Sequence, residues 1–289
     1  MLFEIQHDTT YRYNKPVHLG SHILRLTPRT DGNQRLLEYD CTVSPRPSMQ
    51  SNELDAEGNP VTRLWFTGTT NELRITSSIR LLTLHDNPYD YVVDIPATCL
   101  PMPYNQNEAP FLAAYRYPGN PAPEIVQLAA SIARQSEHNT LAFLGTLNDR
   151  LHSEFKREIR DQDPPQNPEL TLAQGKGACR DLAVLFIAIC RTQGIAARFV
   201  SGYQAHPETP GKRRYLHAWP EVYIPGGGWR GYDPGHGEAV ADGHIALAAA
   251  CMATRTTPID GCFYGDGVHS EMSVDLKIQT SPHIAPDQA

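Results

Sequence analysis

The sequence predicts an α+β protein in which an antiparallel β domain precedes a region built from a central helix packed on an antiparallel sheet. Three observations support this prediction. Hydrophobic residues recur with a period of two from residue 2 to about 85, and with a period of about 3.6 from residue 124 onward. A helix that is apolar on nearly every side then begins at Cys179, and further strands follow it.

The first 85 residues have the regular alternation of half-buried strands. Phe3, Ile5 and His7 alternate with polar residues, and residues 37–43 repeat the pattern. The segments TPRTDGN, SPRPS and DAEGN separate the strands with residues that favour tight turns. Alternation of this kind is typical of antiparallel sheets that are buried on one face and exposed on the other.

The middle of the chain changes from a linker to helices. Residues 96–123 are rich in proline and have no sustained periodicity, so we expect a linker that packs on the surface. Two amphipathic helices follow between 124 and 151. After the loop RDQDPPQNPELT, the next helix begins at Cys179 in the stretch GKGACRDLAVLF, and its apolar character predicts a central position.

Three strands follow this helix, with the sequences AARFVSGY, YLHAWPEVYI and GWRGYDP. The last two are joined by the turn PGGG, so we expect them to be adjacent and antiparallel. Because alternate side chains of a strand share one face, this pairing can bring the Asp233 carboxylate to the His217 imidazole. The tail EMSVDLKI alternates as a further strand, which the sequence does not assign to a sheet.

Cys179 stands where chemistry favours a thiolate. The first turn of a helix has N–H groups without intrahelical partners and the positive end of the helix dipole, which favour an anion and can stabilise an oxyanion. With His217 as base and Asp233 as orienting acid, the arrangement predicts attack by sulfur on an acyl group.

Two other interpretations of these residues remain open. Cys179 could be a buried structural thiol, since cysteine is often found in protein cores. The second alternative is a metal site, whose ligands would be Cys179, His217, Asp233, His236 and His244. No spacing of the HExxH or CxxC type supports that site, and we expect no metal ion or cofactor.

Composition excludes several classes of partner. The net charge of −7 and the scattered basic residues argue against binding to nucleic acid or to an anionic membrane. The six cysteines lie far apart in a chain of 289 residues, which is long enough to fold without disulfides. The N-terminal residues include charges and no apolar run reaches about 18 residues, so we expect a cytoplasmic protein without a targeting segment.

Longer stretches of the sequence resemble a known family. GKGACRDLAVLFIAICRTQGIAARFVSGY and HAWPEVYIPGGGWRGYDP together resemble the transglutaminase-like core of bacterial cysteine hydrolases. HDTTYRYNKPV, RLTPR and DAEGNPV resemble the β domain that precedes this core in the bacterial members, so the resemblance covers nearly the whole chain. It implies a papain-like α+β catalytic domain, with nucleophile, base and orienting acid at Cys179, His217 and Asp233, that transfers acyl groups from amides.

One segment departs from the family pattern. After Asp-Pro the chain reads DPGHGEAV, where the family commonly has a threonine or a similar polar residue after the proline. His236 in this segment could tune the pocket, bind a metal or have no role. Gln174 is a candidate second donor to the oxyanion, and the loop residues Lys212, Arg213 and Arg214 could attract a substrate carboxylate.

We therefore expect an N-terminal β domain (1–95), a linker (96–123), a catalytic core (124–260) and a C-terminal strand and tail (261–289). The expected activity is formation of a thioester on Cys179 with peptide or isopeptide substrates. Hydrolysis is favoured over crosslinking because no amine-binding cleft and no EF-hand calcium loop is recognisable. A catalytically inactive peptide-binding module is the alternative, and the β domain could gate the cleft, position a protein substrate or mediate self-association.

Overall fold

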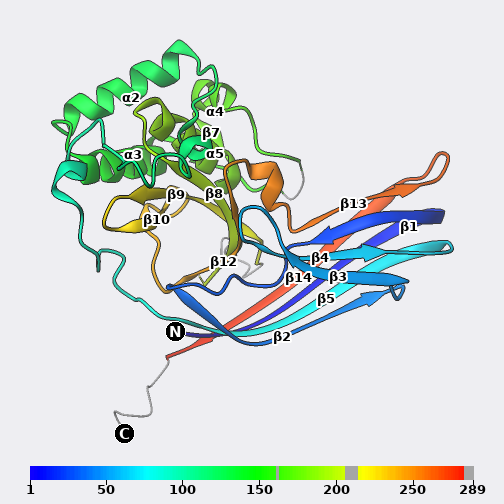
Figure 1. Cartoon of the computed structure of the whole chain (residues 1–289). Coiled ribbons are helices and arrows are strands. Elements are labelled where there is room, and N and C mark those ends of the chain that lie inside the picture. Colours follow the sequence, from blue (N-terminus) through cyan, green and yellow to red (C-terminus); the bar gives the residue numbers. More distant parts are fainter. Residues whose placement is uncertain (161–162, 206–213, 283–289) are drawn as a thin grey trace, which may run out of the picture.

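A computed structural model describes residues 1–160, 163–205 and 214–282 of the chain. Figure 1 shows two parts, an elongated antiparallel sheet and a part in which helices cover a smaller sheet. The α+β class predicted from the sequence is confirmed. Within the described residues, no helix is both long and apolar enough to cross a lipid bilayer.

The elongated sheet is organised around one long strand. The N-terminal half of β1 pairs with β5 on one side and with β14 on the other, and its C-terminal half pairs with β4 and β13. The tail strand that the sequence left without a sheet is therefore β14, and it lies along the first strand of the chain. The strands are β1 (Leu2–Leu24), β2 (Gln34–Ser44), β3 (Met49–Leu54), β4 (Pro60–Trp65), β5 (Thr70–Thr83), β13 (Ile259–Tyr264) and β14 (Ser270–Ser281).

The predicted alternation appears in the burial of β1. Phe3, Ile5 and His7 are buried, whereas Glu4 between them is exposed. The buried face of this sheet belongs to a core that also includes Tyr203 and Ile245 from the smaller sheet. The two parts of the molecule therefore share one apolar core.

The second part contains a five-stranded antiparallel sheet in the order β11-β10-β9-β8-β12. Its strands are β8 (Ala197–Gln204), β9 (His217–Ile224), β10 (Gly228–Asp233), β11 (Glu238–Ala239) and β12 (His244–Ala250). The α-helices are α1 (Ala113–Arg116), α2 (Pro123–Gln135), α3 (Thr140–Glu154), α4 (Pro168–Gln174) and α5 (Cys179–Thr192). Two 3₁₀ turns, η1 (Ile95–Thr98) and η2 (Ala253–Thr256), and the short parallel pair β6 (Lys156–Arg157) and β7 (Lys176–Gly177) complete it.

Helix α5 lies at the centre of this part, as its sequence predicts. Leu182, Leu185 and Ile189 are buried, and the Phe186 ring stacks on Tyr232 of β10 with centroids 5.6 Å apart. Cys179 is the first residue of the helix, so the central packing of α5 fixes the position of this thiol.

Helix α4 and strand β12 are among the elements that were not expected from the sequence. Helix α4 begins at Pro168 after Asn167, whose side chain accepts a hydrogen bond from the Glu169 N–H; an N-cap followed by proline is a recognisable helix start inside a segment that looked like a loop. Strand β12 contains four alanines, which have low strand propensity. The expected segment boundaries remain predictions, and residues 283–289 of the last segment lie outside the described residues.

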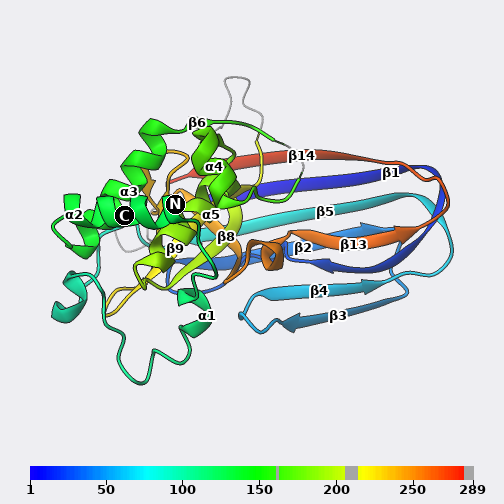
Figure 2. The same cartoon turned by 90° about the horizontal axis from the view of Figure 1, so that it is seen from above.

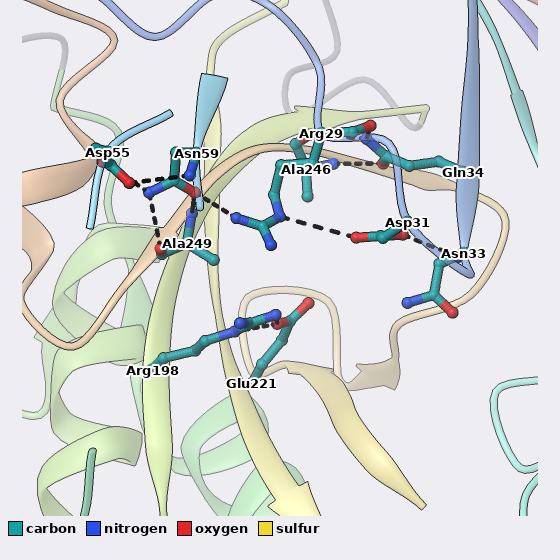
Figure 3. Close-up of polar contacts among 10 residues, drawn as sticks. All are labelled: Arg29, Asp31, Asn33, Gln34, Asp55, Asn59, Arg198, Glu221, Ala246 and Ala249. Atoms are coloured by element: carbon teal, nitrogen blue, oxygen red, sulfur yellow. Dashed lines mark hydrogen bonds and ion pairs between the residues drawn. The ribbon is translucent and has the colours of Figure 1, made fainter. Parts of the chain in front are cut away.

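Two side-chain amides dock the elongated sheet onto the outer edge of β12 (Figure 3). The Gln34 amide donates to the Ala246 carbonyl and accepts from the Ala246 N–H, both at 2.8 Å. The Asn59 amide does the same with Ala249, at 3.0 and 2.8 Å. Each amide thus forms the pair of bonds that a neighbouring strand would form. The Arg29 N–H adds a bond of 3.0 Å to the Ala246 carbonyl, so the relative position of the two parts is defined by backbone bonding.

Candidate active site

The start of α5 is held by a buried carboxylate. Asp181 is fully buried, and its Oδ2 accepts a hydrogen bond of 2.7 Å from the Ala178 N–H, the residue before the helix. Arg160 donates to both carboxylate oxygens at 2.6 and 2.7 Å, and the Gln166 N–H donates at 2.8 Å. Asp181 therefore acts as a cap and an anchor, and it fixes the turn that presents Cys179.

The structure brings Cys179, His217 and Asp233 together. His217 begins β9 and Asp233 ends the adjacent β10, so the hairpin places both side chains at one end of the sheet. His217 Nε2 lies 2.7 Å from Asp233 Oδ2, and both residues are buried. The Cys179 side chain is a hydrogen-bond and charge partner of His217. Because Nε2 is directed to Asp233, Nδ1 is the ring nitrogen that remains for the thiol.

The charges of these groups depend on one another. Burial alone would lower the pKa of His217, but the charges of Asp233 and Cys179 and the hydrogen bonds to both outweigh it and raise that pKa well above its ordinary value. Burial would raise the pKa of Asp233, but the His217 charge and the histidine hydrogen bonds hold it well below the ordinary range. The site therefore favours an imidazolium at His217 that is held by an ionised carboxylate.

Asp233 accepts more hydrogen bonds than its pairing with His217 requires. Its Oδ2 is also 2.8 Å from His236 Nδ1 and 2.9 Å from His244 Nε2. Its Oδ1 accepts from the N–H groups of Gly235 at 2.9 Å and His236 at 3.3 Å. Five donors saturate the carboxylate, which leaves it no other position to adopt.

The two additional histidines both donate a hydrogen bond to Asp233. Arg157 Nη1 lies 3.2 Å from His236 Nε2, and because a guanidinium only donates, Nε2 must accept and Nδ1 carries the proton given to Asp233. Burial lowers the pKa of His244, and among the described residues its buried Nδ1 has no hydrogen-bond partner, which fits a neutral ring protonated at Nε2. His236, whose role the sequence left open, is therefore bound to the predicted acid.

The same cluster contains part of the alternative metal site, but neither group of possible ligands includes Cys179. His217, Asp233 and His236 offer ligand atoms within 4.8 Å of one another, as do Asp233, Glu238 and His244. In the described structure one histidine nitrogen of each ring is directed at Asp233 Oδ2 at hydrogen-bond distance. Hydrogen bonds account for these orientations, and the metal site remains an alternative.

Cys179 and His217 line a cavity of about 590 Å³. Phe199, Ser201 and Leu216 contribute to it from the same part of the molecule. The elongated sheet contributes as well, with side chains from β1 and β14. A role of the β domain in gating the cleft or positioning a substrate remains a prediction, but its side chains line the same cavity as the thiol, through pairing between the two ends of the chain.

The other residues singled out in the sequence lie elsewhere. Gln174 is exposed at the end of α4 and does not line the cavity, so the structure does not support it as an oxyanion donor. Lys212 and Arg213 lie outside the described residues. Arg214 donates a hydrogen bond to the Ala205 carbonyl, at the end of β8.

Comparison with known proteins agrees with this architecture. Residues 3–81 match the family model of the bacterial transglutaminase-like N-terminal region, and residues 126–234 match that of the transglutaminase-like superfamily. An uncharacterized protein of Mycobacterium tuberculosis is 26% identical over 303 residues, which cover 96% of this chain and 92% of that protein. One of Mycobacterium leprae is 26% identical over 293 residues, covering 95% and 97%.

The fold also has a counterpart among solved structures. A candidate cysteine protease from Cytophaga hutchinsonii superposes with a TM-score of 0.71 and 20% sequence identity. The superposition covers 98% of this chain and 92% of that protein, so both the elongated sheet and the helical part are reproduced.

Proposed function

Because the chain belongs to the transglutaminase-like superfamily, with the bacterial transglutaminase-like N-terminal region preceding the core, we propose that it is a cysteine-dependent amide hydrolase or acyltransferase. The observation that carries this proposal is the line of side chains Cys179–His217–Asp233, in which Cys179 is partly exposed, His217 and Asp233 are buried, and the pKa of His217 is raised by the two partners. Such a line can hold a thiolate and an imidazolium side by side, the ground state of a cysteine nucleophile.

In the first half-reaction, the Cys179 thiolate attacks the carbonyl carbon of the amide. The C–N bond breaks, the leaving nitrogen takes the proton from the His217 imidazolium, and the acyl group remains on sulfur as a thioester. Asp233 keeps the ring in the orientation that this proton transfer needs. In the second half-reaction, neutral His217 takes a proton from water or an amine, which attacks the thioester and restores the thiolate.

The oxyanion formed in each step lies close to the start of α5. The first N–H group of a helix has no acceptor within the helix, and in α5 this group belongs to Cys179, whereas the Asp181 N–H already donates to the Ala178 carbonyl. Asp181 supports this function through its bond to Ala178, because it fixes the backbone that carries this donor. We propose peptide or isopeptide bonds as substrates, with hydrolysis wherever water reaches the thioester.

The test is alkylation by iodoacetamide across pH, with each cysteine followed by peptide mass spectrometry. At pH 6 an ordinary thiol is almost entirely protonated, so we expect the Cys179 thiolate to react on the order of 10²- to 10³-fold faster than the exposed Cys99. His217→Ala is expected to slow the alkylation of Cys179 to the rate of Cys99. Cys179→Ala is used to identify the peptide that contains residue 179, because this variant cannot be alkylated there. If Cys179 reacts no faster than Cys99, the chain is better described as a peptide-binding module.

A further inference from the structure

The cavity beside Cys179 has a wall that belongs to the elongated sheet. β1 contributes His7, Thr9 and Tyr11, and β14 contributes Met272 and Val274. Figure 2 shows β1 and β14 side by side along the sheet, and their register pairs Thr9 with Val274 and Tyr11 with Met272. Since alternate residues share a face, these five side chains form one continuous surface.

The His7 and Thr9 side chains of this wall are already hydrogen-bonded, and neither carries a charge. His7 Nδ1 lies 2.9 Å from the Tyr203 hydroxyl, and His7 Nε2 lies 3.1 Å from Thr9 Oγ1. Burial lowers the pKa of His7 to about 4, so this ring is neutral at physiological pH. The wall therefore offers a substrate apolar surface, supplied mainly by Tyr11, Met272 and Val274.

The charges around the cavity are on the other side, on the segments that flank Cys179. Apart from Cys179 and His217 themselves, the charged lining side chains among the described residues are Arg160, Asp163 and Arg180. Arg160 is bound to the buried Asp181, and Arg180 Nη1 donates to the Arg160 carbonyl at 2.9 Å. A substrate that extends from the thiol toward β1 and β14 thus leaves charged surface and meets apolar surface.

We propose that the wall formed by Tyr11, Met272 and Val274 binds a large apolar side chain of a peptide substrate, next to the amide that Cys179 attacks. The proposal rests on the proposed function, and it assigns the β domain a part in choosing the substrate. A volume of about 590 Å³ is in the range of pockets that bind small molecules, so it accommodates more than the reacting group alone. Burial of apolar surface supplies the affinity and selects against charged side chains.

The experiment compares three reagents with the same reactive carbon: iodoacetamide, N-(2-phenylethyl)iodoacetamide and N-(2-sulfoethyl)iodoacetamide. The measured quantity is the rate of Cys179 alkylation relative to iodoacetamide. We expect the phenylethyl reagent to react about tenfold faster, which corresponds to about 1.4 kcal/mol from partial burial of the ring, and the sulfoethyl reagent to react more slowly.

Two variants on β14 test whether the effect comes from the cavity wall itself or from any added charge on this strand. Val274→Asp puts a charge on the cavity face of β14, whereas Ser273→Asp puts the same charge on the opposite, exposed face. In Val274→Asp, the phenylethyl reagent should alkylate Cys179 about as fast as iodoacetamide does. In Ser273→Asp, the ratio of the two rates should be the same as in the parent chain. Met272→Gln, which preserves side-chain length, should lower it in the same direction if Val274→Asp folds poorly.

The outcomes distinguish the two proposals. Fast alkylation by iodoacetamide together with equal rates for all three reagents, or an advantage that survives in Val274→Asp and Met272→Gln, overturns the apolar wall and leaves the proposed function intact. Slow alkylation of Cys179 by iodoacetamide itself overturns the proposed function, and the substrate wall with it.

Discussion

The two sides of the cavity differ in the charge state of their buried polar groups. On the core side, Asp233 is fully buried yet ionised, because five donors and the His217 charge surround it. On the side of the β domain, His7 is equally buried but neutral, with two uncharged hydroxyl partners. The ionised groups thus lie at the proposed catalytic residues, and the neutral groups lie at the proposed substrate wall.

The largest effect should follow from removing the charge on the core side. Asp233→Asn is expected to lower the rate of Cys179 alkylation at pH 6 by about 10³-fold, because an amide neither supports the His217 imidazolium nor accepts from three histidines. The measurement is the mass-spectrometric assay described above. Asp163→Asn, which changes a carboxylate that lines the cavity outside this network, is the control and should react like the parent.

The neutral state of the buried His7 should affect how the free energy of unfolding depends on pH. The pKa of His7 falls from 6.5 to about 4 on folding, so the unfolded chain binds more protons between these values. The stability that His7 contributes is present above pH 6.5 and is lost as the pH falls toward 4, by about 3 kcal/mol in total. Urea unfolding at pH 7 and pH 4.5 should show a smaller difference for His7→Gln than for the parent chain; parallel curves would contradict this assignment.

The contact between the two sides should depend on the two docking amides. Gln34→Ala and Asn59→Ala each leave a backbone N–H and C=O of β12 without these partners, which is expected to cost about 2 kcal/mol per variant. Chemical unfolding measures this cost. Asn33→Ala, at an exposed neighbouring position, should change the unfolding free energy by less than about 0.5 kcal/mol. An equal loss in all three variants would show that the amides have no special role.

The smallest effect is expected for His236, which donates a hydrogen bond to Asp233 in addition to that from His217. His236→Leu removes one hydrogen bond to an ionised group, and we expect Cys179 alkylation at pH 6 to slow about tenfold. His236→Asn can place an amide N–H near the position of Nδ1 and should restore most of the rate. If both variants react alike, His236 does not position Asp233.

The sequence predicts best what is encoded locally. Cys179 is placed by the turn and helix that surround it, and the hairpin of β9 and β10 brings His217 to Asp233 with few possible registers. His236 was singled out only by its departure from the family pattern, and its second partner, Arg157, lies 79 positions earlier, beyond the reach of local reasoning.

Contacts between distant segments could not be predicted in this way. Alternation placed His7 on the buried face of its strand, but the Tyr203 hydroxyl that it bonds comes from another sheet. The wall of the cavity joins β1 to β14, and nothing in either strand specifies the other. The signal that was available is their matching pattern, with Thr9 and Tyr11 facing the same way as Val274 and Met272.

The pairing of β1 with β14 also has a consequence for how the protein is made. Synthesis proceeds from the N-terminus, so residues 2–13 leave the ribosome more than 250 positions before the strand that covers one of their edges. Contacts of such sequence separation form slowly. The core that carries Cys179 is synthesised earlier, and the cavity gains its β14 wall only after residues 270–281 have been made. A nascent chain would then hold the thiol before it holds the surface that selects the substrate.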